Sequence, residues 1–312
     1  MTSLLDWEAM LHPLRTGLAA LALFSGLALR PRLRAEPAGP APIRVATFFP
    51  VLNEIAAQIG GPEVTAIEIV RPGVDPHTFE PSPTDLRGLV GADLVLASDL
   101  GMESSLERLA ANSGPRARVI DASAVLKGLG PYLEVNGRRE PDPHWWNSIP
   151  ATIRVVRKVA SELSALRPGS AGAFAARADA CVARLQALDQ WARIEISSLP
   201  EGRRQLVTSH DAFAWFARDY GFTVHPVTGI SPQSEPNGRD LAALIDRVRR
   251  DRIPAIFVEN SVNPGLLETG TRETGARLGG ALYADGLSAD GDGTTYDGMF
   301  RHNVRTIVEA LR

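Results

Sequence analysis

Two long helical segments separate a first and a second half of the sequence that have similar patterns. Ala151–Leu166 and Ser170–Ser198 contain few helix breakers, and Pro168 with Gly169 separates them. At about 1.5 Å of rise per residue, a helix over Ser170–Ser198 would be about 44 Å long. That length exceeds what one small domain needs, so we expect this helix to connect two lobes rigidly.

In the first half, short apolar runs typical of buried strands alternate with runs of helical spacing. The expected strands are Ile43–Phe49, Val64–Val70, Leu94–Ala97 and Val119–Ile120, and the expected helices are Leu52–Ile59, Pro83–Val90 (capped by Ser82 or Thr84) and Met102–Ala111. Strands that alternate with helices indicate βαβ units and a mainly parallel sheet.

The same alternation restarts after the long helices. The expected strands are Arg204–Thr208, Thr223–Val227, Ala255–Val258 and a strand that ends at Ala281–Tyr283, and the expected helices are Ala212–Tyr220, Asp240–Asp251 and Leu266–Leu278. We therefore predict an α/β fold of two similar parallel-sheet lobes joined by one long rigid helix. The predicted boundaries are an N-terminal lobe over 42–168, a connecting helix over 169–198 and a C-terminal lobe over 199–312.

Residues 1–41 are predicted to be a signal-like leader and linker. The apolar stretch Leu18–Leu29 is flanked by arginines and is shorter than the roughly 20 residues that span a bilayer, which is typical of a secretory signal. A buried N-terminal helix is the alternative. We expect export to the periplasm, and because the single cysteine is Cys181, we do not expect a lipid anchor. The net charge of -3 argues against nucleic-acid binding.

Four side chains share a position at the end of a strand or the start of a helix. They are His77, His144, His210 and Asp285. In open α/β sheets, ligands bind beyond the carboxyl ends of the strands. We therefore expect the four side chains to meet in the interlobe cleft, two from each lobe.

Three imidazoles and one carboxylate are a plausible ligand set for zinc, manganese or iron. Each histidine alone would more often be a surface or capping residue, and the prediction depends on their shared setting. His12 falls in the leader, while His225 and His302 lack that setting and are expected to be structural or exposed.

Several motifs resemble those of the metal-ion solute-binding proteins of bacterial ABC importers, the zinc- and manganese-binding, TroA-like class. They are RPGVDPHTFEPSP, DPHWW, TSHDAFAWFARDYG, GISPQSEP, FVENSV and LYADGLS. The resemblance runs from Ile43 to the C-terminus. It implies a periplasmic receptor that is not an enzyme, with a metal ion held by the same four residues. It also implies delivery to an ABC permease in the inner membrane, and we expect a monomer.

Some positions depart from the pattern of that class. Members that take manganese often have glutamate at the position of His210, while the loop Lys127–Asp142 lacks the histidine- and acid-rich tract common in zinc importers. The cysteine pair of some zinc-binding members is absent. Trp145–Asn147 replaces a usual Trp-Leu-Asp run, which we expect to alter packing without removing a ligand. The identity of the metal therefore stays open.

Metal-bound histidines usually donate their second ring N–H to a carboxylate or carbonyl. The candidates for this supporting role are Glu80, Ser209, Asp211 and Glu235, and Glu259 could line the cleft without being a ligand. A zinc-dependent hydrolase using the same cluster is the alternative function, although catalytic zinc usually keeps one position for water. A binding protein for an organic solute is a third alternative, which would predict an aromatic-lined cleft and no histidine cluster.

Overall fold

The computed structural model describes residues 40–98, 117–135, 137–229, 238–259 and 271–312. Ala41–Arg312 forms one compact unit, and the preceding unit, Met1–Pro40, lies almost wholly outside the described residues. Residues 1–39 of the predicted leader and linker, and the predicted helix Met102–Ala111, are therefore outside the described part of the chain.

The first lobe contains a four-stranded parallel sheet in the order β2-β1-β3-β4. Its strands are β1 (Ile43–Thr47), β2 (Val64–Glu68), β3 (Leu94–Ala97) and β4 (Arg118–Asp121), and its described helices are α1 (Pro50–Gly60) and α2 (Pro83–Leu89). Ser82 caps α2, because its hydroxyl accepts from the Asp85 N–H while the Asp85 carboxylate accepts from the Ser82 N–H.

The second lobe contains a similar parallel sheet in the order β10-β9-β7-β8. Its strands are β7 (Gln205–Thr208), β8 (Thr223–Pro226), β9 (Ala255–Glu259) and β10 (Arg277–Leu282), and its helices are α6 (Ala214–Tyr220), α7 (Gly238–Asp251) and α9 (Tyr296–Leu311). A parallel sheet with its helices occurs both before and after the long helices in the sequence, which confirms the predicted α/β fold class.

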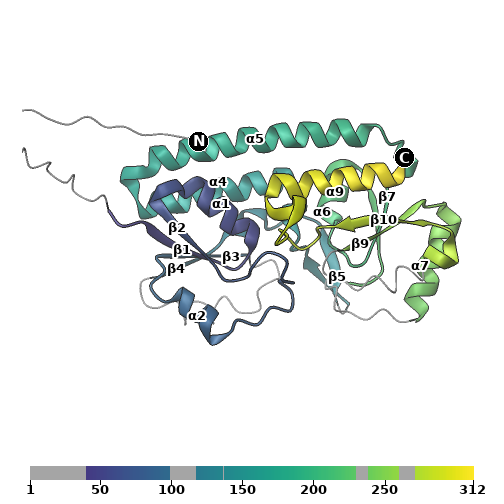
Figure 1. The fold of residues 1–312 in the computed structure, drawn as a ribbon, viewed down its shortest axis with the longest axis horizontal. Helices are drawn as coiled ribbons and strands as arrows, with labels where there is room; N and C mark the ends of the chain where they lie inside the picture. Colours follow the sequence, from purple (N-terminus) through teal and green to yellow (C-terminus); the bar gives the residue numbers. More distant parts are fainter. Residues whose placement is uncertain (1–39, 99–116, 136, 230–237, 260–270) are drawn as a thin grey trace, which may run out of the picture. The chain divides into compact units, whose positions relative to one another are not determined.

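Two consecutive helices lie between the lobes in the sequence. They are α4 (Ile149–Leu166) and α5 (Ala171–Ser197), with a short 3-10 turn at Pro168–Ser170 between them. Helix α5 packs against α4, against α1 of the first lobe and against α9 of the second lobe, so it runs along both lobes (Figure 1). Its buried side chains recur every three or four residues, from Phe174 to Ile196. This is the connecting helix that the sequence predicts.

Two features differ from the sequence-based expectation. The loop after Lys127 contains an antiparallel hairpin, β5 (Tyr132–Val135) and β6 (Arg138–Pro141), that we did not predict. The predicted helix Leu266–Leu278 is wrong at its C-terminal end, because Arg277 and Leu278 begin β10. In that strand a Cβ on Gly279 would lie 2.5 Å from the Phe257 ring, so β10 requires glycine where a strand former would be expected.

The remaining described elements are short 3-10 turns. They are Gly61–Glu63, Ala122–Leu126, Trp145–Asn147, Glu201–Arg203 and Gly291–Thr294. Within the described residues, none of the helices has the length and apolar character needed to span a bilayer.

Candidate metal centre

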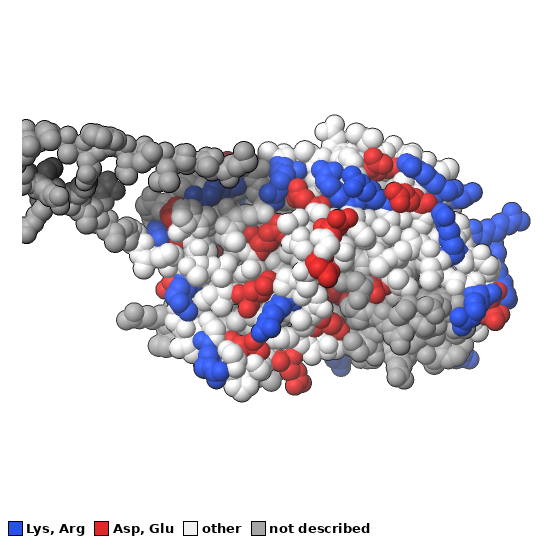
Figure 2. Space-filling model, in the orientation of Figure 1, with Lys and Arg blue, Asp and Glu red and all other residues white. Residues whose placement is uncertain are grey.

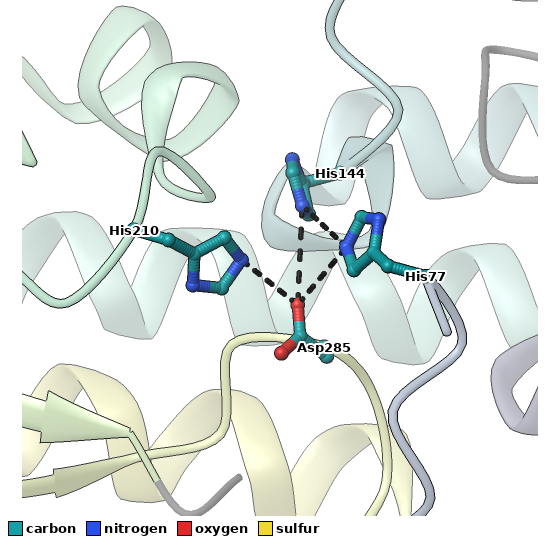
Figure 3. A group of neighbouring side chains, drawn as sticks. All are labelled: His77, His144, His210 and Asp285. Atoms are coloured by element: carbon teal, nitrogen blue, oxygen red, sulfur yellow. Dashed lines mark hydrogen bonds and ion pairs between the residues drawn. The ribbon is translucent and has the colours of Figure 1, made fainter. Parts of the chain in front are cut away.

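The four predicted metal ligands come together between the two lobes. His77 lies in the loop between β2 and α2, and His144 lies between β6 and the 3-10 turn that precedes α4. His210 follows β7, and Asp285 follows β10. One potential ligand atom from each residue lies within 4.8 Å of all the others. Figure 3 shows the imidazoles directed toward the Asp285 carboxylate.

The distances between these atoms suit a single shared cation. His210 Nε2 lies 3.0 Å, His77 Nε2 3.4 Å and His144 Nε2 3.9 Å from Asp285 Oδ1. The His77 and His144 Nε2 atoms are 3.1 Å apart. Ligand bonds of about 2.0–2.1 Å around a tetrahedral zinc ion would place neighbouring ligand atoms about 3.3 Å apart.

The site is almost closed to solvent. The side chains of His144 and His210 are fully buried, while those of His77 and Asp285 are 7% and 6% exposed. His210 Nε2 makes no hydrogen bond to the described residues, although Asp285 is close to it. A buried ring nitrogen without a partner is costly, and either a proton held against Asp285 Oδ1 or a bound cation would satisfy this one.

Asp-Pro-His occurs twice and folds similarly in both places. Asp75 Oδ1 accepts a hydrogen bond from the His77 backbone N–H at 2.8 Å, and Asp142 Oδ1 accepts one from the His144 backbone N–H at 2.9 Å. Each aspartate thereby closes a tight turn two residues before a candidate ligand. The proline between them fixes its own φ, so both ligands emerge from restricted backbone.

Two buried carboxylates support the histidines from outside the cluster. Asp142 Oδ1 lies 2.7 Å from His144 Nδ1. Glu259 Oε1 accepts from the His210 backbone N–H at 3.1 Å, and its Oε2 contacts His210 Nδ1. Because Glu259 ends β9, which lies between β7 and β10, it is placed beside the segment of His210. Both contacts favour the tautomer with a proton on Nδ1, which leaves Nε2 to bind a metal.

Charges within the site alter its proton affinities. Burial lowers the pKa of His210, but the carboxylates of Asp285 and Glu259 outweigh that effect and raise it to about 10. Burial raises the pKa of Asp285, but His210 and His77 outweigh burial and hold it well below its usual value. Burial lowers the pKa of His144 despite the adjacent Asp142. Without a metal ion, these shifts favour a protonated His210 beside an ionised Asp285.

The predicted supporting residues lie elsewhere or make other contacts. Glu80 is exposed, and Glu235 lies outside the described residues. The Ser209 hydroxyl is buried and has no hydrogen-bond partner in the described part of the chain. Asp211 is half-buried, and burial raises its pKa to about 6. The ring Nδ1 atoms of His144 and His210 contact Asp142 and Glu259 instead.

The other described histidines are separate from this cluster. His225 Nε2 lies 2.7 Å from Gln205 Oε1, and His302 Nε2 lies 2.9 Å from the Ala281 carbonyl oxygen. Neither belongs to the group of converging ligand atoms, in agreement with the sequence-based prediction.

Comparison with known proteins identifies relatives along nearly the whole described chain. The family model described as ZnuA, zinc-uptake complex component A periplasmic, matches residues 45–310. The manganese-binding lipoprotein MntA of Bacillus subtilis is 36% identical over 310 residues, which cover 96% of this chain and all of that protein. Its lipoprotein name conflicts with our expectation that a lipid anchor is absent.

Solved structures agree with this assignment. The periplasmic zinc-binding protein TroA of Treponema pallidum matches with a TM-score of 0.79 and 31% identity, covering 87% of this chain and 99% of that one. A manganese-bound periplasmic metal-binding protein of Candidatus Liberibacter asiaticus matches with a TM-score of 0.78 and 25% identity, covering 86% and 99%. The chain belongs to the ZnuA family of periplasmic metal-binding proteins, the substrate-binding components of ABC importers for divalent transition metals.

Proposed function

We propose that His77, His144, His210 and Asp285 bind one divalent transition metal ion, which the protein delivers to an ABC permease in the inner membrane. The observation that carries this proposal is the convergence of four ligand atoms within 4.8 Å in a buried position. The ligands come from both lobes, so a bound ion would stabilise the closed arrangement of the lobes. The protein would act in the periplasm as a monomer.

The ligand set supports zinc as the more tightly bound ion and manganese as a weaker one. Three imidazole nitrogens and one carboxylate oxygen suit zinc, whereas manganese prefers more oxygen ligands. For a given site, the intrinsic affinity order also places zinc above manganese. Which metal the protein carries in the cell then depends on the supply of each ion.

A zinc hydrolase is less well supported than a receptor. Catalytic zinc usually has three protein ligands and an open position for water, whereas four protein side chains converge here. The exposure of these side chains does not exceed 7%, so a substrate would have little access to the ion. We expect the zinc-loaded protein to hydrolyse neither ester nor peptide substrates.

Calorimetric titration of metal-stripped protein with zinc and manganese tests the proposed site. His77→Ala and His210→Ala should each weaken zinc binding about a hundredfold, because each ligand contributes roughly a quarter of the binding free energy of a four-ligand site. His225→Ala is the matched control, since His225 contacts Gln205 and lies outside the cluster. Unchanged affinity in both ligand variants would show that the metal binds elsewhere.

A further inference from the structure

The 3-10 turn Trp145–Asn147 directly follows the ligand His144 and reaches across to the second lobe. The Asn147 side chain is 1% exposed. Its Nδ2 donates one hydrogen bond to the Ala212 carbonyl oxygen at 2.9 Å and another to the Ala284 carbonyl oxygen at 3.2 Å. A single amide group therefore joins the first lobe to two separate segments of the second.

Those two segments are the ones that carry metal ligands. Ala212 lies two residues after His210, and Ala284 immediately precedes Asp285. The turn that bears Asn147 itself begins after His144. Asn147 thus connects three of the four ligand-bearing segments through hydrogen bonds to backbone atoms. Only the loop of His77 is outside this connection.

Neighbouring contacts reinforce the same junction. Trp146 Nε1 also donates to the Ala284 carbonyl oxygen, at 2.7 Å. In the opposite direction, Trp215 Nε1 of the second lobe donates to the Asp142 carbonyl oxygen at 2.9 Å. These donors and acceptors are buried, so separating the lobes here would leave polar groups without partners.

We propose that Asn147 is a positioning residue that holds the His210 and Asp285 segments at the distance from His144 that metal coordination requires. This inference rests on the proposed function of the site. A metal ion binds more tightly when its ligands are already in place, because less ordering remains to be done on binding. Without the amide, Trp146 Nε1 would still bind the Ala284 carbonyl oxygen, but the Ala212 carbonyl oxygen would lose its hydrogen bond to the turn.

Two substitutions remove the amide in different ways. Asn147→Leu retains the branched shape of the side chain, with slightly more volume, but has no donor, and Asn147→Ala avoids any steric conflict. Thr152→Val is the matched control, because Thr152 is 1% exposed and its hydroxyl lies 3.0 Å from the Tyr296 hydroxyl across the same lobe boundary. The Thr152 side chain contacts no ligand segment, and Thr152→Val retains the hydrogen bond that the Tyr296 hydroxyl donates to the Trp146 carbonyl oxygen at 2.9 Å. The control therefore measures how the loss of a buried polar contact between the lobes, by itself, changes zinc release and the Co²⁺ spectrum.

Zinc release into excess EDTA and the visible absorption of bound Co²⁺ are the readouts, with circular dichroism to establish folding. Both Asn147 variants should release zinc about tenfold faster than the parent, because the loss of about the net free energy of one hydrogen bond leaves the ligand segments less firmly held. Their Co²⁺ spectra should also change, because that absorption depends on ligand geometry. Thr152→Val should match the parent in both measurements.

Each other outcome would count against the proposal. Parent-like release and spectra in both Asn147 variants would show that the amide does not position the ligands. Equal acceleration in Thr152→Val would assign the effect to general loosening of the lobes. If neither Asn147 variant folds, the residue serves folding and the positioning role is overturned. If the parent itself binds neither zinc nor cobalt, the proposed function fails, and the role of Asn147 fails with it.

Discussion

Metal capture by this site should be coupled to the loss of a proton from His210. The carboxylates of Asp285 and Glu259 overcome burial and raise the His210 pKa to about 10. The imidazole must be neutral to coordinate a metal ion. Below pH 10, protons and metal ions therefore compete for the same nitrogen, and raising the pH favours the metal.

The size of this competition follows from the pKa. At pH 7 about one His210 side chain in a thousand would be neutral without metal, which corresponds to about 4 kcal/mol of opposing free energy at about 1.36 kcal/mol per unit. Zinc binding should then release about one proton from this residue at pH 7. The apparent affinity should rise about tenfold per pH unit between pH 7 and 8.5.

Calorimetric titrations in buffers of different ionisation enthalpy measure the number of protons released, and chelator competition across the pH range measures the slope. His225→Ala should behave like the parent, because its histidine contacts Gln205 outside the cluster. Zinc affinity that stays constant between pH 7 and 8.5, with no proton released, would refute the assignment of a protonated His210 to the metal-free site.

Three further predictions concern the supporting residues and stability. Glu259→Gln should lower zinc affinity about 10–100-fold, measured by chelator competition, because glutamine replaces one of the two carboxylate oxygens that accept from the His210 N–H and Nδ1–H with an NH₂ donor; full affinity would contradict this. In metal-stripped protein, protonated His210 adds to the free energy of unfolding because its pKa is higher in the folded state than in the unfolded chain. This contribution is fully present below about pH 6.5 and is lost as the pH rises toward 10, so the urea concentration at the unfolding midpoint should fall over that range. Zinc at a thousandfold excess over its Kd should stabilise the protein by about 4 kcal/mol, seen as a higher Tm that His210→Ala largely loses.

The convergence of the four candidate ligands could be predicted because each occupies a setting visible in the sequence. The two Asp-Pro-His tripeptides restrict the backbone before a helix, and the other two residues follow apolar runs typical of strands. Parallel strands bring such positions to one edge of a sheet, so their convergence follows from the fold class. The long connecting helix was visible for a similar reason, since its pattern continues without a breaker.

The supporting carboxylates depend on information that the sequence pattern lacks. Glu259 reaches His210 because β9 lies between β7 and β10, and local residue preferences do not predict this order of strands. Asp142 was accessible in principle, because it repeats the place of Asp75 two residues before a histidine. Ser209 and Asp211 are adjacent to His210 in the sequence, whereas the contacting carboxylate, Glu259, is distant in the sequence.

At β10 and at Asn147, tertiary packing decides the structure against what the local sequence pattern indicates. Gly279 and Gly280 weaken the strand signal, yet the close approach of Phe257 to Gly279 requires a glycine there. Asn147 reads as an ordinary polar residue before a helix, but its amide is buried between the lobes. Both outcomes are decided by segments far away in the sequence.

Anomalous X-ray diffraction at the zinc edge from crystals of the zinc-loaded protein tests the central claim most directly. The account predicts one strong peak between the lobes, about 2.0–2.2 Å from His77 Nε2, His144 Nε2, His210 Nε2 and Asp285 Oδ1. A peak at any other cluster would contradict the proposed site. A zinc ion coordinated by fewer of these four residues, with water completing the coordination, would also contradict it.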